Sequence, residues 1–188
     1  MSDYWFAARA TSTELRRISL DFGLRRTVRQ LQELIVPELG RVWFVRQLSW
    51  PVAALALRES LRGRTNARAS TISHGLEALG CRLEWQTEPD GDRILGKRAF
   101  GRDGNDFWTF HELHSARHYV RNTHRQAATR ALRDEGGLGL ATGSRFDRLE
   151  LTRVGEELAD AFLEQPVGRG RGTLRAPLEA WILGGATM

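Results

Sequence analysis

Residues 149–162 read LELTRVGEELADAF, and this stretch decides the fold because two periodicities meet in it without a loop between them. Leu149 and Leu151 alternate with charged neighbours, which is typical of a half-buried strand. The apolar residues that follow have helical spacing and share one face of a helix, and they are Val154, Leu158, Ala161 and Phe162. The sequence therefore predicts a short strand that runs directly into an amphipathic helix.

The segment in front of this junction completes a small unit. Residues 121–140 begin with a helical pattern that Gly136 and Gly137 are expected to stop. A strand, a turn at TGSR (142–145) and the return strand then follow. From residue 113 to residue 133 the chain has no acidic residue, and its arginines there are Arg117, Arg121, Arg125, Arg130 and Arg133.

The earlier half of the chain shows a similar order of elements. Pro51 suits the first turn of a helix, and TISHGLEALG (71–80) predicts a second helix that its final glycine ends. RLEWQT (82–87) alternates as a strand does, and RILGKRAF (93–100) follows a PDGD turn as the return strand. Residues 60–76 contain no acid, and the arginines in this interval are Arg62, Arg64 and Arg68.

Further elements are predicted at both ends. Thr11 and Glu14 have capping-box spacing, which marks the start of an N-terminal helix. A second N-terminal helix carries one apolar stripe and stops before Pro37; the stripe consists of Leu24, Val28, Leu31 and Ile35. Near the C-terminus, a basic linker precedes the helix PLEAWILGG (177–185), whose tryptophan and isoleucine need a surface to cover them.

The stretch RLELTRVGEELADAF (148–162) resembles the wing strand and following helix of MarR- and PadR-type winged-helix regulators, which often carry L-T-x-x-G at this junction. The resemblance covers residues 114–163, and the first half of the chain matches by element order alone. It implies that Thr152 caps the helix and that Gly155 allows the helix to pack closely.

We therefore expect a mainly α-helical fold with small β-hairpins, built from two winged-helix-like units. The expected divisions are an N-terminal helical segment (1–42), a first winged-helix-like unit (43–107), a second such unit (108–165), and a basic linker with a short C-terminal helix (166–188). In this arrangement the two units are packed with the N-terminal helices.

The charge of the chain favours a polyanionic partner. Its net charge is +5 at pH 7 and its isoelectric point is near 10.5, and nucleic acid is the commonest partner for such a protein. Lys97 is the single lysine beside 27 arginines, so GC-rich codon usage is an alternative source of the charge.

Composition also limits the cellular setting. Cys81 is the one cysteine, which excludes an internal disulfide and a multi-cysteine zinc site within the chain. No apolar run approaches the roughly 18 residues that cross a bilayer, and the first residues lack the pattern of a signal peptide. We expect a cytoplasmic protein without a membrane partner.

A histidine cluster is the one candidate for metal binding. His111, His114 and His118 would share a face if they lay on one helix, and imidazoles are zinc ligands. Ser115 stands where a metalloprotease helix of the H-E-x-x-H type carries its glutamate. We favour a polar, cationic helix face, and expect no metal and no cofactor. No nucleophile–base pair is found, so an enzymatic function is not expected.

The favoured function is non-enzymatic binding of double-stranded DNA through the basic helix faces. The predicted contact residues are Arg62, Arg64, Arg68, Arg117, Arg121, Asn122, Thr123, Arg125, Gln126, Arg130 and Arg145. The alternative is an adaptor subunit of a bacterial multi-protein complex, similar to the tandem winged-helix partners of kleisins, which binds protein instead of DNA. A protein partner or a homodimer is expected in either case.

Overall fold

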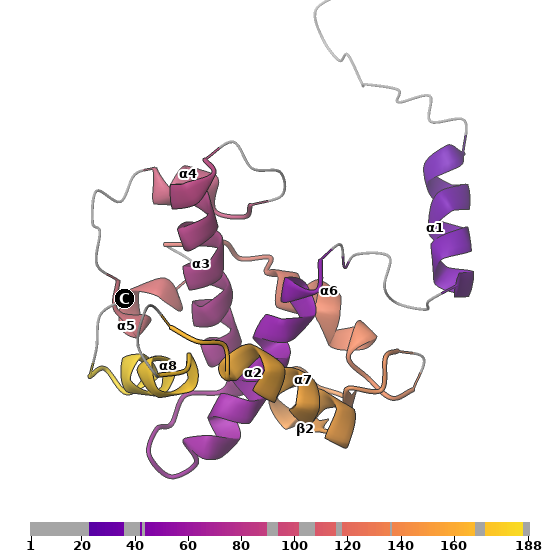
Figure 1. Cartoon of the computed structure of the whole chain (residues 1–188). Helices are drawn as coiled ribbons and strands as arrows, with labels where there is room; N and C mark the ends of the chain where they lie inside the picture. The colour runs from indigo at the N-terminus through magenta and orange to yellow at the C-terminus, as the bar shows by residue number, and fades with distance from the viewer. Residues whose placement is uncertain are drawn as a thin grey trace, which may run out of the picture.

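The computed structural model describes residues 23–35, 42, 44–89, 94–101, 108–115, 118–135, 137–167 and 172–185 (Figure 1). The helices are α1 (Leu24–Ile35), α2 (Arg46–Ser60), α3 (Ala69–Thr87), α4 (Lys97–Phe100), α5 (Phe110–Leu113), α6 (His124–Ala131), α7 (Arg153–Leu163) and α8 (Arg175–Ile182). Strands β1 (Ala141–Thr142) and β2 (Glu150–Leu151) are separated by the 3-10 helix η1 (Phe146–Arg148). The described part is mainly helical with a small two-stranded antiparallel sheet, as predicted at this coarse level.

Helices α2 and α3 form the central pair of the molecule. At Gly80 the two helices approach so closely that a Cβ atom would lie 2.5 Å from the Trp50 ring. Gly80 therefore serves helix packing, and the prediction that it ends a helix is wrong because α3 continues to Thr87. The predicted helix start at Pro51 is also wrong, since α2 begins at Arg46 and contains the proline.

The hairpin predicted in the first half of the chain is not found. Residues 82–87, expected as a strand, are the last turns of α3, and residues 97–100 of the expected return strand form α4. The strand prediction assumed that Leu83 is buried and Arg82 is exposed, and the structure has the reverse. Leu83 is 49% exposed, whereas Arg82 is buried with its guanidinium 4.1 Å from the centre of the Trp108 ring. The described residues of 43–107 contain no strand.

The second half follows the predicted order of helix, strand, turn, strand and helix. Strand β1 pairs with β2 in the register Ala141 to Leu151, and α7 begins two residues after β2 ends. The side chain of Thr152 accepts a hydrogen bond from the Gly155 amide, which confirms the predicted cap. A Cβ atom on Gly155 would collide with the carbonyl oxygen of Leu140, so the close packing is confirmed as well.

Two hydrophobic cores hold the fold together. The first core joins α2 and α3 with α5 and α8, and its members include Trp50, Leu57, Leu76, Leu113 and Trp181. The second core joins α2 and the start of α3 with the β-hairpin and α7, and its members include Val52, Leu55, Ala69, Leu140, Phe146 and Ala159. Both cores draw on residues from the two halves of the chain.

Helix α8 closes the first core. The Trp181 ring is fully buried, and its indole N–H donates to the Trp108 carbonyl oxygen at 2.9 Å. The C-terminal helix predicted from residue 177 is therefore confirmed, with an earlier start at Arg175 and a positive φ at Gly184 just beyond its end.

At the other end of the chain, α1 confirms the helix predicted from the stripe that begins at Leu24. The helix predicted from Thr11 and Glu14 lies outside the described residues. Among the helices that the structure describes, none combines the length and the apolar character that crossing a membrane requires.

Candidate nucleic-acid interface

The loop between α2 and α3 presents the first group of predicted contact residues. Arg62, Arg64 and Arg68 are all exposed, and Gly63, with a φ of 81°, lets the chain turn between the first two. The guanidinium of Arg62 pairs with Glu59 at 2.6 Å. This exposed pair is weak, because both groups are largely in water. The loop therefore offers its arginines to solvent.

Asp147 joins this loop to the β-hairpin. Its carboxylate accepts hydrogen bonds from the Ser70 amide at 2.7 Å and from the Ser70 hydroxyl at 3.0 Å. The amide at the start of α3 has no partner within its own helix, so the carboxylate satisfies it and also faces the positive end of the helix dipole. This contact fixes η1 against the N-terminus of α3, 77 positions earlier in the chain.

The Asp147 contact brings two basic segments to the same side of the molecule. Asp147 and the side chains of Arg58, Arg62 and Arg68 line one small cavity of about 240 Å³. Two further arginines flank Asp147 on the hairpin turn, and both are exposed. We call the exposed arginines of the loop and the turn the basic rim, which consists of Arg62, Arg64, Arg68, Arg145 and Arg148.

The basic rim has little internal neutralisation. Of its five arginines, only Arg62 forms an ion pair with a carboxylate of the described part of the chain. Asp147 lines a cavity together with Arg62 and Arg68, and its two oxygens already accept from Ser70. The rim is therefore a surface of net positive charge.

The second predicted group, around the start of α6, is arranged differently. Arg117, Arg121 and Arg125 have the spacing of one side of a helix, but residues 118–123 are not helical and α6 begins at His124. Arg121 precedes the helix, and Arg117 lies outside the described residues. Arg121, Asn122, Gln126 and Arg130 are exposed, and the Gln126 amide donates to the Arg121 carbonyl oxygen at 3.4 Å.

Two predicted contact residues of this group face inward. Thr123 is only 5% exposed, so its side chain does not reach a base edge. The guanidinium of Arg125 lies over the Phe146 ring at 5.1 Å, and burial lowers its pKa, although Asp147 and Glu77 oppose this effect. These positions do not favour base reading by either residue, which stays a prediction. Arg125 instead ties α6 to the hairpin turn.

A buried carboxylate sets the start of α6. Glu77 of α3 is fully buried and accepts hydrogen bonds from the amides of His124 and Arg125, at 2.7 and 3.0 Å. The Tyr119 hydroxyl donates to the same carboxylate at 2.8 Å. Burial raises the pKa of Glu77, and these hydrogen bonds oppose the shift. The sequence pattern does not reveal Glu77, because its partners are more than 40 positions away.

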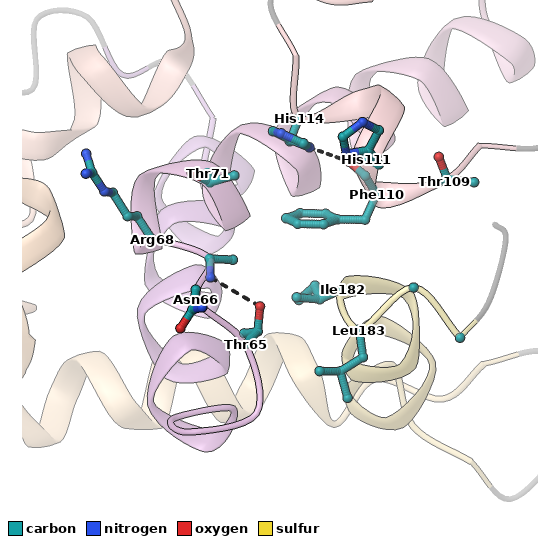
Figure 2. A pocket seen from close by; sticks show the side chains of 13 residues that line it. Thr65, Asn66, Arg68, Thr71, Thr109, Phe110, His111, His114, Ile182 and Leu183 are labelled. Atoms are coloured by element: carbon teal, nitrogen blue, oxygen red, sulfur yellow. Dashed lines mark hydrogen bonds between the residues drawn. The ribbon is translucent and has the colours of Figure 1, made fainter.

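A pocket beside the rim has a volume of about 1070 Å³ and is drawn in Figure 2. Phe110 and Ile182 face each other across it, whereas the Arg68 side chain extends away from them. The pocket is a cleft between the start of α3, α5 and the end of α8, and its lining is mixed, with threonine, asparagine and histidine side chains beside the apolar ones. The Arg68 guanidinium belongs to the basic rim.

The predicted histidine face is not formed, since α5 ends at Leu113 and only His111 of the three lies in a helix. The rings of His111 and His114 are 5.5 Å apart, and Nδ1 of His114 bonds to the Phe110 carbonyl oxygen. No group of three possible ligands that could hold a metal ion is found within the described ranges.

Sequence reasoning missed Arg58, Asp147 and Arg148. The two arginines have a usable signal, because each lies close in sequence to a predicted contact residue. Asp147 has none, since only the fold shows that it reaches Ser70.

Comparisons with known proteins add no relative. No protein-family model matches the chain, and no curated protein or solved structure matches it significantly.

Proposed function

We propose that the chain binds double-stranded DNA without catalysing a reaction, and that the basic rim is its main contact surface. The observation that carries this proposal is the Asp147–Ser70 contact, which gathers the arginines of two distant segments on one side. DNA carries one phosphate charge per about 1.7 Å of axis, so a group of exposed guanidinium groups matches it. In this proposal, the segment from α6 to α7 is a winged helix and the rim includes its wing.

Phosphate contacts give affinity and orientation but little choice of sequence. Asn122 and Gln126 are the exposed amide side chains beside the start of α6, and amides of this kind can read adenine in the major groove. The proposal therefore assigns affinity to the rim and sequence choice, where present, to these two residues.

The test is a salt titration of binding to a random DNA duplex, followed by fluorescence anisotropy. The double variant Arg68→Glu/Arg145→Glu removes two phosphate contacts, so the slope of log K against log salt should become shallower by about 1.8. Affinity at low salt should fall at least about tenfold, because each site then also repels phosphate.

The matched control is Arg98→Glu, which makes the same charge change on α4, beside the C-terminal half of α3 and away from the rim (Figure 1). This variant should keep most of the wild-type affinity and slope. An unchanged slope in the double variant, or an equal loss in the control, would show that the rim does not hold DNA.

The alternative function, a protein-binding adaptor, has one observation in its favour. Leu24, Val28 and Leu31 of α1 are 67%, 49% and 53% exposed, which leaves an apolar helix face open to a protein. If the rim variants bind DNA normally but no longer co-purify with another subunit, the adaptor function is supported and DNA binding is not.

A further inference from the structure

Helix α1 presents an apolar face that no other residue of the described part of the chain covers. Leu24, Val28 and Leu31 follow one another at spacings of four and three, which places them on one side of the helix. All three are at least 49% exposed, and Figure 1 shows α1 standing apart from the other helices. The first six residues of α1, LRRTVR, hold three arginines and no acid, so the helix is basic as well as amphipathic.

A groove that combines apolar residues with several carboxylates lies between α2, β2 and α7. Its volume is about 630 Å³, and its floor is apolar, formed by Leu55, Ala56, Leu149, Leu151 and Ala159. Four carboxylates line its edge, and they belong to Glu59, Glu150, Glu156 and Asp160. Two of the four are engaged, because Glu59 pairs with Arg62 and Asp160 with Arg175.

Glu150 and Glu156 are the carboxylates that remain available. Both are exposed, and neither forms an ion pair within the described part of the chain. Arg58 and Arg62 also line the groove, on the side formed by α2 and the residues after it. The basic start of a helix, which also carries the positive end of the helix dipole, is attracted to carboxylates such as those of Glu150 and Glu156.

We propose that α1 of a second copy of the chain occupies this groove, with Leu24, Val28 and Leu31 on the apolar floor and the basic first half of the helix nearest Glu150 and Glu156. Within the described part of one copy, neither the apolar face of α1 nor the groove is covered. In a pair of copies, each copy's α1 can therefore fill the groove of the other. Such an exchange is isologous and closes at a dimer.

The size of the contact suits this arrangement. A 12-residue helix is about 18 Å long and about 10 Å wide, so a single docked helix makes a small interface. Reciprocal exchange doubles the buried area, which brings it toward the roughly 1,600 Å² of a stable complex. A stable dimer therefore needs both docked helices. A substitution on α1 is present in both copies, so it weakens both contacts of the dimer.

Sedimentation of the full chain over a concentration series tests the proposal. The wild type should form a dimer, and Val28→Asp should shift the dissociation constant upward by at least about 100-fold. Val28 is exposed and distant from both cores, so the variant should keep its helical circular dichroism. Val154→Asp is the matched control, since Val154 is 56% exposed on α7 but does not line the groove, and it should remain dimeric.

Charge reversal in the groove is the second test. Glu156→Arg should weaken the dimer, because the introduced arginine repels the basic first half of α1. A wild-type monomer, a Val28→Asp dimer of normal strength, or a Glu156→Arg dimer of normal strength would each overturn the proposal.

Cysteine cross-linking decides between exchange and docking within one chain. Cys81 is buried and will not compete, so a tagged Leu31→Cys chain can be mixed with an untagged Ser60→Cys chain under oxidising conditions. The proposal predicts a disulfide between chains of different mass, whereas Leu24→Cys, at the other end of α1, should stay unlinked from Ser60→Cys. If only a chain that carries both Leu31→Cys and Ser60→Cys becomes linked, and only internally, the second copy is excluded.

Discussion

At the scale of the residue, Glu77 determines where the second half of the molecule docks. Its carboxylate receives two backbone amides of α6 and the Tyr119 hydroxyl, whose oxygen also lies 3.3 Å from the Cys81 sulfur. A buried carboxylate is costly unless hydrogen bonds surround it, and here three donors do so. Position 77 thus supplies the N-terminal partner that α6 lacks in its own sequence.

Replacing Glu77 with glutamine should lower the free energy of unfolding by about 2 kcal/mol, because the amide keeps one acceptor oxygen and turns an N–H group toward a backbone donor. Tyr119→Phe removes one donor only and should cost about 1 kcal/mol. Urea denaturation followed by tryptophan fluorescence measures both values. Equal stability of Glu77→Gln and the wild type would mean that the carboxylate does not anchor α6.

At the scale of the element, α3 is longer and α6 is shorter than the sequence predicts. The alternation at 82–87 indicates a strand only if Arg82 is taken as exposed, yet its guanidinium is buried over an aromatic ring. Gly80 resembles a helix stop, but its missing side chain makes room for Trp50. Local patterns therefore failed where a distant residue decides the environment.

Local patterns succeeded at the junction after β2, where the deciding contacts are close in sequence. Thr152 caps α7 three residues ahead, and Gly155 lies against Leu140 in the same hairpin. For the candidate site, the exposed loop arginines were predictable from charge alone. The position of Arg125 was not predictable, because Glu77 and Phe146, which are distant in sequence, hold its backbone amide and its guanidinium.

Gly155→Ala should lower the free energy of unfolding by about 2–3 kcal/mol, because its new methyl group meets the Leu140 carbonyl and must push α7 away from the hairpin. Gly172→Ala is the control: a Cβ atom there meets open space, so the change should stay within about 0.5 kcal/mol. Chemical denaturation of the two variants in parallel provides the comparison. Equal effects would show that the close approach at Gly155 does not matter.

At the scale of the whole molecule, stability depends on helices that face two cores at once. Helix α2 gives Trp50, Ala53 and Leu57 to the first core and Val52 and Leu55 to the second. A helix that is buried on most sides carries little amphipathic pattern, which explains why the sequence did not reveal its true start. The stability of the whole fold also depends on pH, because burial lowers the pKa of both His74 and His124 to about 4.

Burial lowers the pKa of His124 from 6.5 to about 4, and the charge of Arg46 adds to the shift. The unfolded chain therefore takes up a proton that the folded chain refuses, so stability is complete above about pH 6.5 and falls as the pH drops toward 4. His124→Asn keeps an acceptor for the Gln47 amide, 2.9 Å from Nδ1, but cannot titrate.

The loss of unfolding free energy between pH 7 and pH 4.5 should be smaller in His124→Asn than in the wild type, by on the order of 1 kcal/mol. This figure is below the full conversion of the pKa shift because the imidazole retains some contact with solvent. Thermal denaturation at several pH values gives both curves. Parallel curves would show that His124 already carries its proton in the native state.

The double membership of α2 has a practical consequence for anyone who wishes to divide this protein for expression. A cut anywhere between 61 and 140 would leave one fragment holding α2 and the other holding the hairpin wall that α2 covers. Neither fragment could then bury its apolar core residues alone, and each would aggregate unless the other fragment were expressed with it. Such a pair would work as a complementation system, in which recovery of solubility reports that the two pieces have met.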